Sequence, residues 1–359
     1  MRGGIFNIEW SLLIPVFILV LLSLAALFSI NIVYFKSQIG YLIVSLAAFV
    51  FFSNVNWRIL EHYSVPIYIF SLICLVIVLI LGIESRGAVR WMDIFGLRIQ
   101  FSEILKPFLA VSFSSYLSTL KIKNFKSLIA GLLLVFPIGF LVYLQPDLGN
   151  ALIYFIVVIF TLIVFGYPLI WFFLGSLFTA VSLPLSMNFL HGYQKQRLLT
   201  FFNPGSDPLG SSYNAIQSVM SVGSGMFFGK GLGEGTQSML RFLPERHTDF
   251  IFAALSEQFG FVGSIVVLGS FAFLLYKIYL IYDNSDEKFC KIFSACAFSL
   301  ILVQVFVNIG MNIGVVPIVG ITLPFVSYGG SSILSSFILL GFLSSVSRNF
   351  RNKDTLEIR

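Results

Sequence analysis

The sequence predicts an all-α polytopic membrane protein, on three observations. Of the 359 residues, 58% are hydrophobic and only 11% are charged, against roughly 25% charged in a soluble domain. Apolar runs of about 20 residues, the length that crosses a bilayer as a helix, recur along the chain. The breaks between them are short and polar, and the runs lack the alternation of a membrane barrel. This composition excludes a soluble globular protein.

Ten apolar segments are candidate transmembrane helices. They lie near residues 11–32, 39–54, 64–83, 103–120, 127–144, 149–166, 168–189, 249–282, 289–312 and 327–347. The first is too long for the apolar part of a signal peptide, so we expect it to remain as a span. Between the last two, Pro317, Gly320 and Pro324 interrupt any regular helix. Irregular backbone at membrane depth must be buried or line a cavity, so this segment is either a structural plug or a cavity wall.

Lysine and arginine are distributed unevenly over the loops. With ten spans both termini lie on one side, and the short loops of that side carry most of the cations, among them Lys123, Lys126 and Arg348. The positive-inside rule then places both termini in the cytoplasm. Residues 1–359 form a single integral membrane domain, and the one long loop, about 190–248 between the seventh and eighth spans, lies outside. We expect this loop to be ordered, with a short amphipathic helix in "SSYNAIQSVMSV".

Five polar residues stand directly before the eighth span, in "FLPERHTDFIF". One interpretation is a plain N-cap formed by Thr248 or Asp249. A cap explains only one of the five, and a carboxylate at the centre of a membrane helix costs about 2.5–3.5 kcal/mol. At about 100° per residue, Asp249 shares a stripe of small residues with Ala253 and Gly260, which lets another helix approach. We therefore expect Asp249 to face the bundle, while Glu257, two turns further on, is either functional or a structural hydrogen-bond partner.

A second group of charges precedes the fourth span, in "ESRGAVRWMDIFGLRIQFSEILKP". Glu103 and Lys106 stand three residues apart and can pair on one helix face, and we expect Pro107 to kink the helix locally. The pair is either a structural ion pair or a lysine held ready for a phosphate. Trp91 fits an aromatic belt at the membrane interface.

Two further motifs carry weaker signals. The run "GSGMFFGKGLGEGTQ" is not a nucleotide-binding P-loop, because its glycine spacing differs and Lys230 is followed by glycine. Its glycines still permit tight turns whose amides suit an anion. The motif "QPDLGN", with Asp147, is a plausible turn by its chemistry alone.

Several of these motifs together resemble the SEDS family (shape, elongation, division and sporulation). The resemblance rests on "QPDLG", "GKG…GTQ", "FLPERHTDFIFA", "SEQFGF" and "PIVGITLPFVSYGGSS" in this order, and it covers nearly the whole chain. It is closer to the rod-shape branch of the family than to the division branch. The motif "SEILKP" matches more loosely, with Phe101 where the family commonly has proline.

The resemblance implies a peptidoglycan glycosyltransferase of the bacterial cytoplasmic (inner) membrane, acting outside the cell in elongation and rod-shape maintenance. Its substrate would be lipid II, a disaccharide-pentapeptide on undecaprenyl pyrophosphate. Its partners would be a class B penicillin-binding protein and other elongation-machinery membrane proteins, with no nucleic acid and no organic cofactor. The family's essential aspartate matches Asp249, and its outer tryptophan, acid and lysine match Trp91, Glu103 and Lys106.

The residues agree with the chemistry of such a transfer. An α-linked donor that yields a β-1,4 link reacts with inversion, which needs one general base for the acceptor hydroxyl. Asp249 is our hypothesis for that base, with His247 as a weaker candidate. The pyrophosphate needs cations or a metal ion rather than an acid. The proposed contacts are Lys106, Arg197 and Lys230, with Arg246 and Arg241 as equals or as solvated loop residues.

Three alternatives remain open at this stage. Asp249 can instead hold a divalent cation, magnesium or manganese, as a metal ligand. The protein can be a flippase that moves lipid II outward, although its polar residues gather at one face rather than at mid-membrane, where transporter sites lie. It can also be a non-catalytic scaffold for a penicillin-binding protein, in which case Asp249 would be dispensable.

Overall fold

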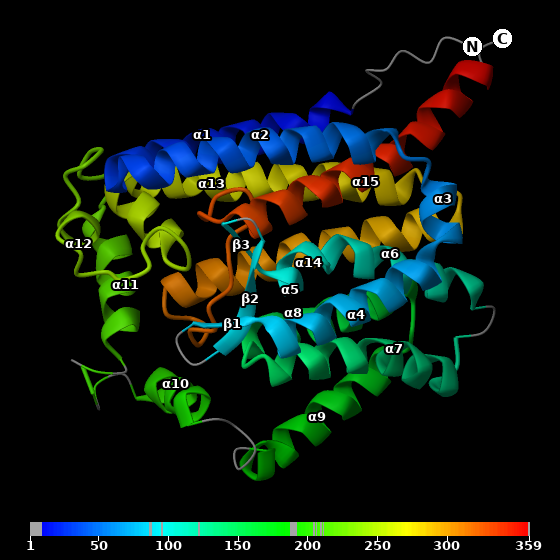
Figure 1. The fold of residues 1–359 in the computed structure, drawn as a ribbon, viewed down its shortest axis with the longest axis horizontal. Helices are drawn as coiled ribbons and strands as arrows, with labels where there is room; N and C mark the ends of the chain where they lie inside the picture. Colours follow the sequence, from blue (N-terminus) through cyan, green and yellow to red (C-terminus); the bar gives the residue numbers. More distant parts are fainter. Residues whose placement is uncertain are drawn as a thin grey trace.

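A computed structural model gives the fold, and it describes residues 9–357 except 86–87, 95, 121–122, 187–191, 204, 206, 209 and 211. Long helices lie side by side in one bundle, and α1 begins at the same end of the bundle where α15 ends (Figure 1). The helices are α1 (Trp10–Ile30), α2 (Ile32–Asn54), α3 (Trp57–His62), α4 (Ser64–Leu81), α5 (Phe101–Ile104), α6 (Lys106–Thr119), α7 (Phe125–Leu144), α8 (Leu148–Phe165), α9 (Leu169–Ser186), α10 (Gly192–Phe202), α11 (Tyr213–Ser224), α12 (Thr236–Met239), α13 (Ile251–Asp283), α14 (Lys288–Asn312) and α15 (Gly330–Glu357).

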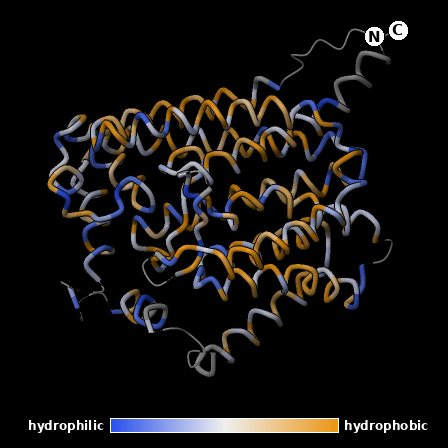
Figure 2. The backbone as a smooth tube through the Cα atoms, viewed as in Figure 1, coloured by the Kyte–Doolittle hydropathy of each residue, from blue (hydrophilic) through white to orange (hydrophobic). Residues whose placement is uncertain are grey.

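The length and hydropathy of these helices make the chain a polytopic membrane protein, as predicted. Within the described residues, eight helices are long and apolar enough to cross a membrane: α1, α2, α4, α7, α8, α13, α14 and α15. Their apolar surfaces run along the bundle, and hydrophilic residues gather toward its two ends (Figure 2). The other two predicted spans fall on α6, which has 14 residues, and on α9, whose described apolar stretch is shorter than the other eight.

The centre of the bundle is formed by α14 and α15. In these two helices 78% and 83% of the apolar window is buried, against 17% in α2. Phe293 of α14 packs edge-on against Phe342 of α15, with ring centroids 6.2 Å apart, and both are no more than 1% exposed. The helices around them leave large apolar side chains exposed, as expected of a surface in contact with lipid.

A small antiparallel sheet departs from the all-α prediction. The sequence interval before the fourth predicted span forms β1 (Ile83–Ser85), β2 (Ala88–Ile94) and β3 (Leu97–Ile99), in the order β1-β2-β3. The turn between β2 and β3 closes on Gly96, which has φ 81° and donates its amide to the Asp93 carboxylate. Strands this short carry little periodicity, and the charges between them favoured a loop interpretation.

Helix α13 is broken at Gly260, where the sequence predicted a continuous small-residue stripe. Gly260 has φ 67°, which favours glycine. In an unbroken helix, Phe261 and Val262 would donate to the carbonyls of Glu257 and Gln258. The glycine-rich loop 226–231 supplies partners for all four of these groups instead. The bonds are Phe261 N to Met226 O (2.9 Å), Val262 N to Phe227 O (3.2 Å), Lys230 N to Glu257 O (2.9 Å) and Gly231 N to Gln258 O (3.1 Å).

The described parts of the long loop include α10, α11 and α12. Helix α11 falls on the predicted amphipathic segment and packs against α13. The segment between α14 and α15 is irregular, with positive φ at Gly314, Gly320, Phe325 and Gly329. Part of it is buried and part lines a cavity, so both interpretations of this segment apply.

Candidate active site

The backbone around Asp249 is held by two asparagines of α14. Asn308 and Asn312 both donate side-chain amide protons to the carbonyl of Asp249, at 3.1 and 3.0 Å. The Asn312 side-chain oxygen accepts from the amide of Ala253 at 3.0 Å. Both asparagines are fully buried. These bonds to α14 fix the backbone at the start of α13. The Asp249 side chain takes no part in them.

Neither proposed N-cap is present. Helix α13 begins at Ile251, and its cap residue, Phe250, makes no side-chain cap. The Thr248 hydroxyl donates to Glu245 instead, to the carbonyl at 3.3 Å and to the carboxylate at 3.0 Å. The cap interpretation of Thr248 and Asp249 is thus wrong, because the chain makes a turn through Glu245 before the helix starts.

The Asp249 carboxyl is partly buried among charges of both signs. Burial, reinforced by the negative charge of Glu245, raises its pKa to about 6. Arg197 and Arg90 act in the opposite direction and lower it. A carboxylate with this pKa is mostly ionised at neutral pH and is still basic enough to accept a proton, the balance that a general base requires.

His247 lies in an aromatic stack rather than beside an acceptor position. Its ring is parallel to that of Tyr34 from α2, with centroids 4.3 Å apart and planes 7° apart, and Tyr328 packs at 5.6 Å. Its backbone carbonyl accepts from the Tyr328 amide at 2.9 Å. These contacts join the residues before α13 to α2 and to the start of α15.

The predicted pair of Glu103 and Lys106 is confirmed. Lys106 Nζ lies 2.7 Å from Glu103 Oε1, and both side chains are less than 5% exposed. The pair spans the break between α5 and α6, where Pro107 follows directly. Trp91 lies in β2 opposite Ile83 and is half-buried. Because the charge of Lys106 is directed at Glu103, its contact with a pyrophosphate stays a prediction.

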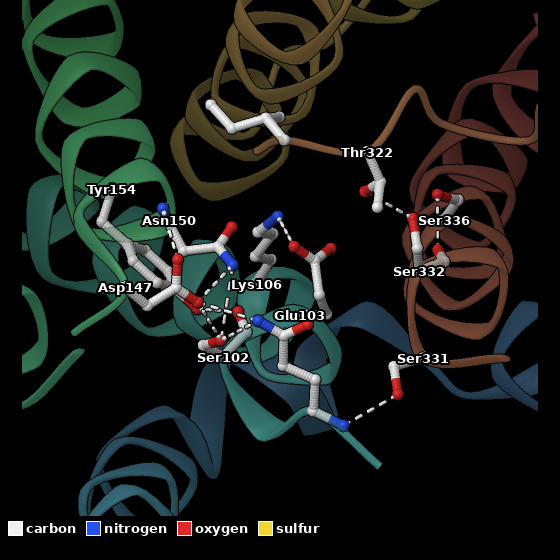
Figure 3. A network of polar contacts seen from close by, with 12 residues as sticks. Ser102, Glu103, Lys106, Asp147, Asn150, Tyr154, Thr322, Ser331, Ser332 and Ser336 are labelled. Carbon is white, nitrogen blue, oxygen red and sulfur yellow. Dashed lines mark hydrogen bonds and ion pairs between the residues drawn. The ribbon is translucent and has the colours of Figure 1, made fainter. Parts of the chain in front are cut away.

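A buried network around Asp147 is the part of this region that the sequence did not indicate. Asp147 caps α8 through the Asn150 amide and accepts from the side chains of Gln100 (2.8 Å) and Asn150 (2.9 Å) and from Ser102 (3.3 Å). Figure 3 shows it beside the Glu103–Lys106 pair. Its carboxylate also lies 3.9 Å from Arg90. Asp147 therefore joins the start of α5 to the start of α8 and pairs with an arginine whose charge lowers the pKa of Asp249. The local "QPDLG" turn chemistry gave no sign of partners 45 to 47 residues away.

Lys230 and Glu257 form an anchor for the long loop. The Glu257 side chain is fully buried and accepts from the amides of Gln237 and Ser238, each at 2.9 Å. Lys230 Nζ lies 3.3 Å from it. Glu257 thus takes the structural one of its two proposed roles. Arg246 lies nearer Asp249 in sequence and is partly buried; burial and the charge of Arg241 lower its pKa.

The donor set around Asp249 does not form a protein metal site by itself. Among the described residues, no group of three or more His, Cys, Asp or Glu side chains is placed to hold an ion. Glu245 is the neighbouring acid whose charge acts most on Asp249, and two arginines act against it. Magnesium is often bound by one or two carboxylates together with substrate phosphates. A cation at Asp249 would therefore need the phosphates of a substrate to complete its ligands.

Fold and site together define a class: a helical membrane protein with a carboxyl of raised pKa directly before α13, which begins at the end of the bundle remote from the termini (Figure 1). Residues 5–352 match the family model described as "Cell cycle protein", which groups FtsW, RodA and SpoVE. The chain belongs to this family, the SEDS family of the sequence motifs.

Relatives and solved structures agree with this assignment and indicate a RodA-like member. "Peptidoglycan glycosyltransferase MrdB" of Escherichia coli K12 is 36% identical over 87% of this chain and 85% of its own length. "Probable peptidoglycan glycosyltransferase FtsW" of Wigglesworthia glossinidia brevipalpis is 38% identical over 81% and 78%. The rod shape determining protein RodA of Thermus thermophilus superposes with a TM-score of 0.74 at 26% identity, over 96% of this chain and 98% of that one. A chain from "Structural coordination of polymerization and crosslinking by a peptidoglycan synthase complex" superposes with a TM-score of 0.84 at 29% identity, over 96% and 98%.

Proposed function

We propose that this protein polymerises lipid II by inverting glycosyl transfer, with Asp249 as the general base. The chain is a peptidoglycan glycosyltransferase of the RodA-like type, the activity carried in the names of its MrdB and FtsW relatives. The observation that carries the catalytic assignment is the environment of Asp249. Asn308 and Asn312 fix its backbone carbonyl, and these bonds do not use its carboxyl. The carboxyl has a pKa of about 6, which suits proton transfer near neutral pH.

The proposed step moves one proton and one glycosyl bond. The acceptor 4-hydroxyl attacks the anomeric carbon of the α-linked donor, and a β-1,4 bond forms as the bond to pyrophosphate breaks. Asp249 takes the hydroxyl proton as the attack proceeds. Pyrophosphate leaves with its electron pair and needs positive charge rather than a proton.

Two arginines are candidates to neutralise the charge of the leaving group. Arg197 of α10 and Arg90 of β2 both lower the pKa of Asp249, so both lie within electrostatic reach of it. Arg246 is the third candidate, three residues away in the chain. To take part, Lys106, Lys230 and Arg90 would have to leave or share their respective partners, which are Glu103, Glu257 and Asp147. A divalent cation, bound by Asp249 and the pyrophosphate together, is the alternative that would make Asp249 a ligand.

We propose ten spans, with α6 and α9 as the two short ones, and both termini in the cytoplasm of a bacterium. The site then lies on the outer face of the inner membrane, under the long loop. A class B penicillin-binding protein, within the elongation machinery, would crosslink the polymer. The similar chain from a peptidoglycan synthase complex, which coordinates polymerization with crosslinking, supports such a partner.

The test is polymerisation in detergent, where no membrane has to be crossed. Purified protein with its penicillin-binding partner receives lipid II, and glycan polymer is measured by gel electrophoresis. We expect polymer from the native chain and none from Asp249→Asn with its thermal unfolding unchanged. Full activity of Asp249→Asn would end the base assignment. Absence of polymer from the native chain, together with lipid II scrambling in liposomes, would favour a flippase, and absence of both would favour a scaffold.

The metal question needs a separate measurement. The same reaction is run in excess chelator, followed by add-back of magnesium or manganese. If Asp249 acts as a base alone, polymer yield is independent of the chelator. Loss of activity that either ion restores would show that a cation is required and would favour the ligand role.

A further inference from the structure

An apolar groove lies between the long loop and the irregular segment after α14. Its volume is about 410 Å³, within the 300–1,000 Å³ typical of ligand sites. Its walls come from α10, from α11 and from residues 311–318. Ile216, Val219, Met311, Val316 and Ile318 are among the lining side chains. Arg197 and Thr200 are the polar side chains of a lining that is otherwise apolar, so most of the groove suits a hydrocarbon chain.

The apolar side chains of the groove are not closed off by the protein. Val219 is 44% exposed, Met220 48% and Ile313 43%. Clustered apolar exposure at a functional face is typical of a surface that binds something. The wall formed by residues 311–318 is packed against α11. Met311 is 1% exposed, and the Ser218 hydroxyl donates a hydrogen bond to the Asn312 carbonyl at 2.9 Å.

Arg197 is the cation among the residues that line this groove. It comes from α10 and is exposed. Arg197 is also the cation that most strongly opposes the raised pKa of Asp249. The groove and the proposed base are further joined through Asn312, whose carbonyl accepts from α11 and whose side chain holds the Asp249 carbonyl. An apolar channel, an arginine and a carboxylate therefore follow one another.

We propose that this groove binds the first isoprene units of a lipid-linked substrate, with Arg197 on the adjoining pyrophosphate. The order of groups fits such a molecule: hydrocarbon against α11 and residues 311–318, anion at Arg197, sugar at Asp249. At about 30 Å³ per small group, the volume holds on the order of a dozen carbon atoms, or two to three isoprene units. The remainder of the chain extends into the membrane. This inference rests on the proposed function, since it places the substrate of the same site.

The test uses a bulky substitution in the groove and a matched one outside it. Val219→Trp fills the groove from α11. Val262→Trp is the control, because Val262 is 42% exposed, close to the 44% of Val219, and does not line the groove. Both proteins receive lipid II analogues whose pyrophosphate carries one, two or three isoprene units, and KM and kcat for polymer formation are measured.

In the native chain and in Val262→Trp, we expect KM to fall by about tenfold from one to three isoprene units. In Val219→Trp this dependence of KM on chain length should disappear. Unchanged chain-length dependence in Val219→Trp would overturn the groove assignment while leaving glycosyl transfer by Asp249 intact.

A second measurement does not depend on activity or on the folding of a variant. The native protein is mixed with undecaprenyl pyrophosphate that carries a photoreactive diazirine on its second isoprene unit, irradiated and digested. Label on the peptides of residues 213–224 and 311–318 supports the groove. Label confined to the lipid-facing helices α2, α4 or α9 would contradict it, whether or not the protein polymerises lipid II.

Discussion

Asp249 directly precedes α13 and Glu257 lies eight residues further on, within the helix, yet their surroundings differ. The Glu257 carboxylate is fully buried and accepts two backbone amides and the charge of Lys230. At Asp249 the amide protons of Asn308 and Asn312 go to the backbone carbonyl, and the carboxyl has its pKa raised to about 6. A carboxylate bonded to several donors is a structural support, whereas one held by its backbone keeps its side chain for chemistry.

The largest expected effect separates these two acids by activity. Asp249→Asn removes the proposed base at constant size and should lower kcat by about 10²- to 10⁴-fold. Glu257→Gln should change kcat per folded molecule by less than about threefold, because it touches no proposed reacting atom. Polymer formation by both variants, normalised to the folded fraction, is the measurement. Equal losses in the two would remove the distinction between them.

Stability should respond in the reverse order. Glu257→Gln leaves two buried amides and Lys230 with a weaker partner, and we expect unfolding to become easier by about 1–3 kcal/mol. Asp249→Asn should not lower the melting temperature, since an amide in place of a partly buried carboxyl removes charge from a site that disfavours it. Thermal unfolding followed by intrinsic fluorescence in one detergent compares them. A lower melting temperature for Asp249→Asn than for Glu257→Gln would contradict the assignment.

The pH dependence of the native enzyme provides a further test. The base must be ionised, so kcat/KM should rise with pH and reach half its plateau near pH 6, the pKa of Asp249. Between pH 7 and pH 5 the ionised fraction falls from about 90% to about 10%, a roughly tenfold loss of rate. Rates at a fixed lipid II concentration well below KM give the profile. A flat profile across this range would exclude Asp249 as the titrating base.

The smallest effect concerns the neighbouring arginines. Arg197 and Arg90 both lower the pKa of Asp249, so Arg197→Gln and Arg90→Gln should each move the acidic limb to higher pH, by up to about one unit. The larger shift is expected for Arg197. The position of the limb is read separately from the plateau rate, which also changes if these residues bind pyrophosphate. A shift to lower pH in either variant would mean that the arginine does not face the carboxyl.

The sequence was informative where a signal is local. Runs of apolar residues mark helices by length alone, and a described helix falls on each of the ten predicted segments. The pair of Glu103 and Lys106 follows from their spacing of three residues, and the position of Asp249 beside a membrane helix is visible in the chain itself. Each of these depends on neighbours within one or two helical turns.

Other features depended on contacts distant in sequence. Asp147 looked like a turn residue, because its partners Gln100 and Ser102 lie at the start of α5, 47 and 45 residues away in the chain. The break at Gly260 became intelligible only with loop 226–231 beside it, which satisfies the backbone groups that the break exposes. The N-cap at Thr248 failed for a similar reason, since a turn through Glu245 was locally as plausible.

By itself, the sequence determined the class of the protein, its helices and the identity of the acid at the mouth of the eighth predicted span. It did so because hydrophobic length and charge placement are properties of a chain in a membrane before any packing is specified. Only the tertiary structure decided that Glu257 is hydrogen-bonded to backbone amides, that the pKa of Asp249 is raised, and that Arg197 lines an apolar groove. Burial, pKa and groove shape arise from side chains that different helices bring together, and no single segment contains that information.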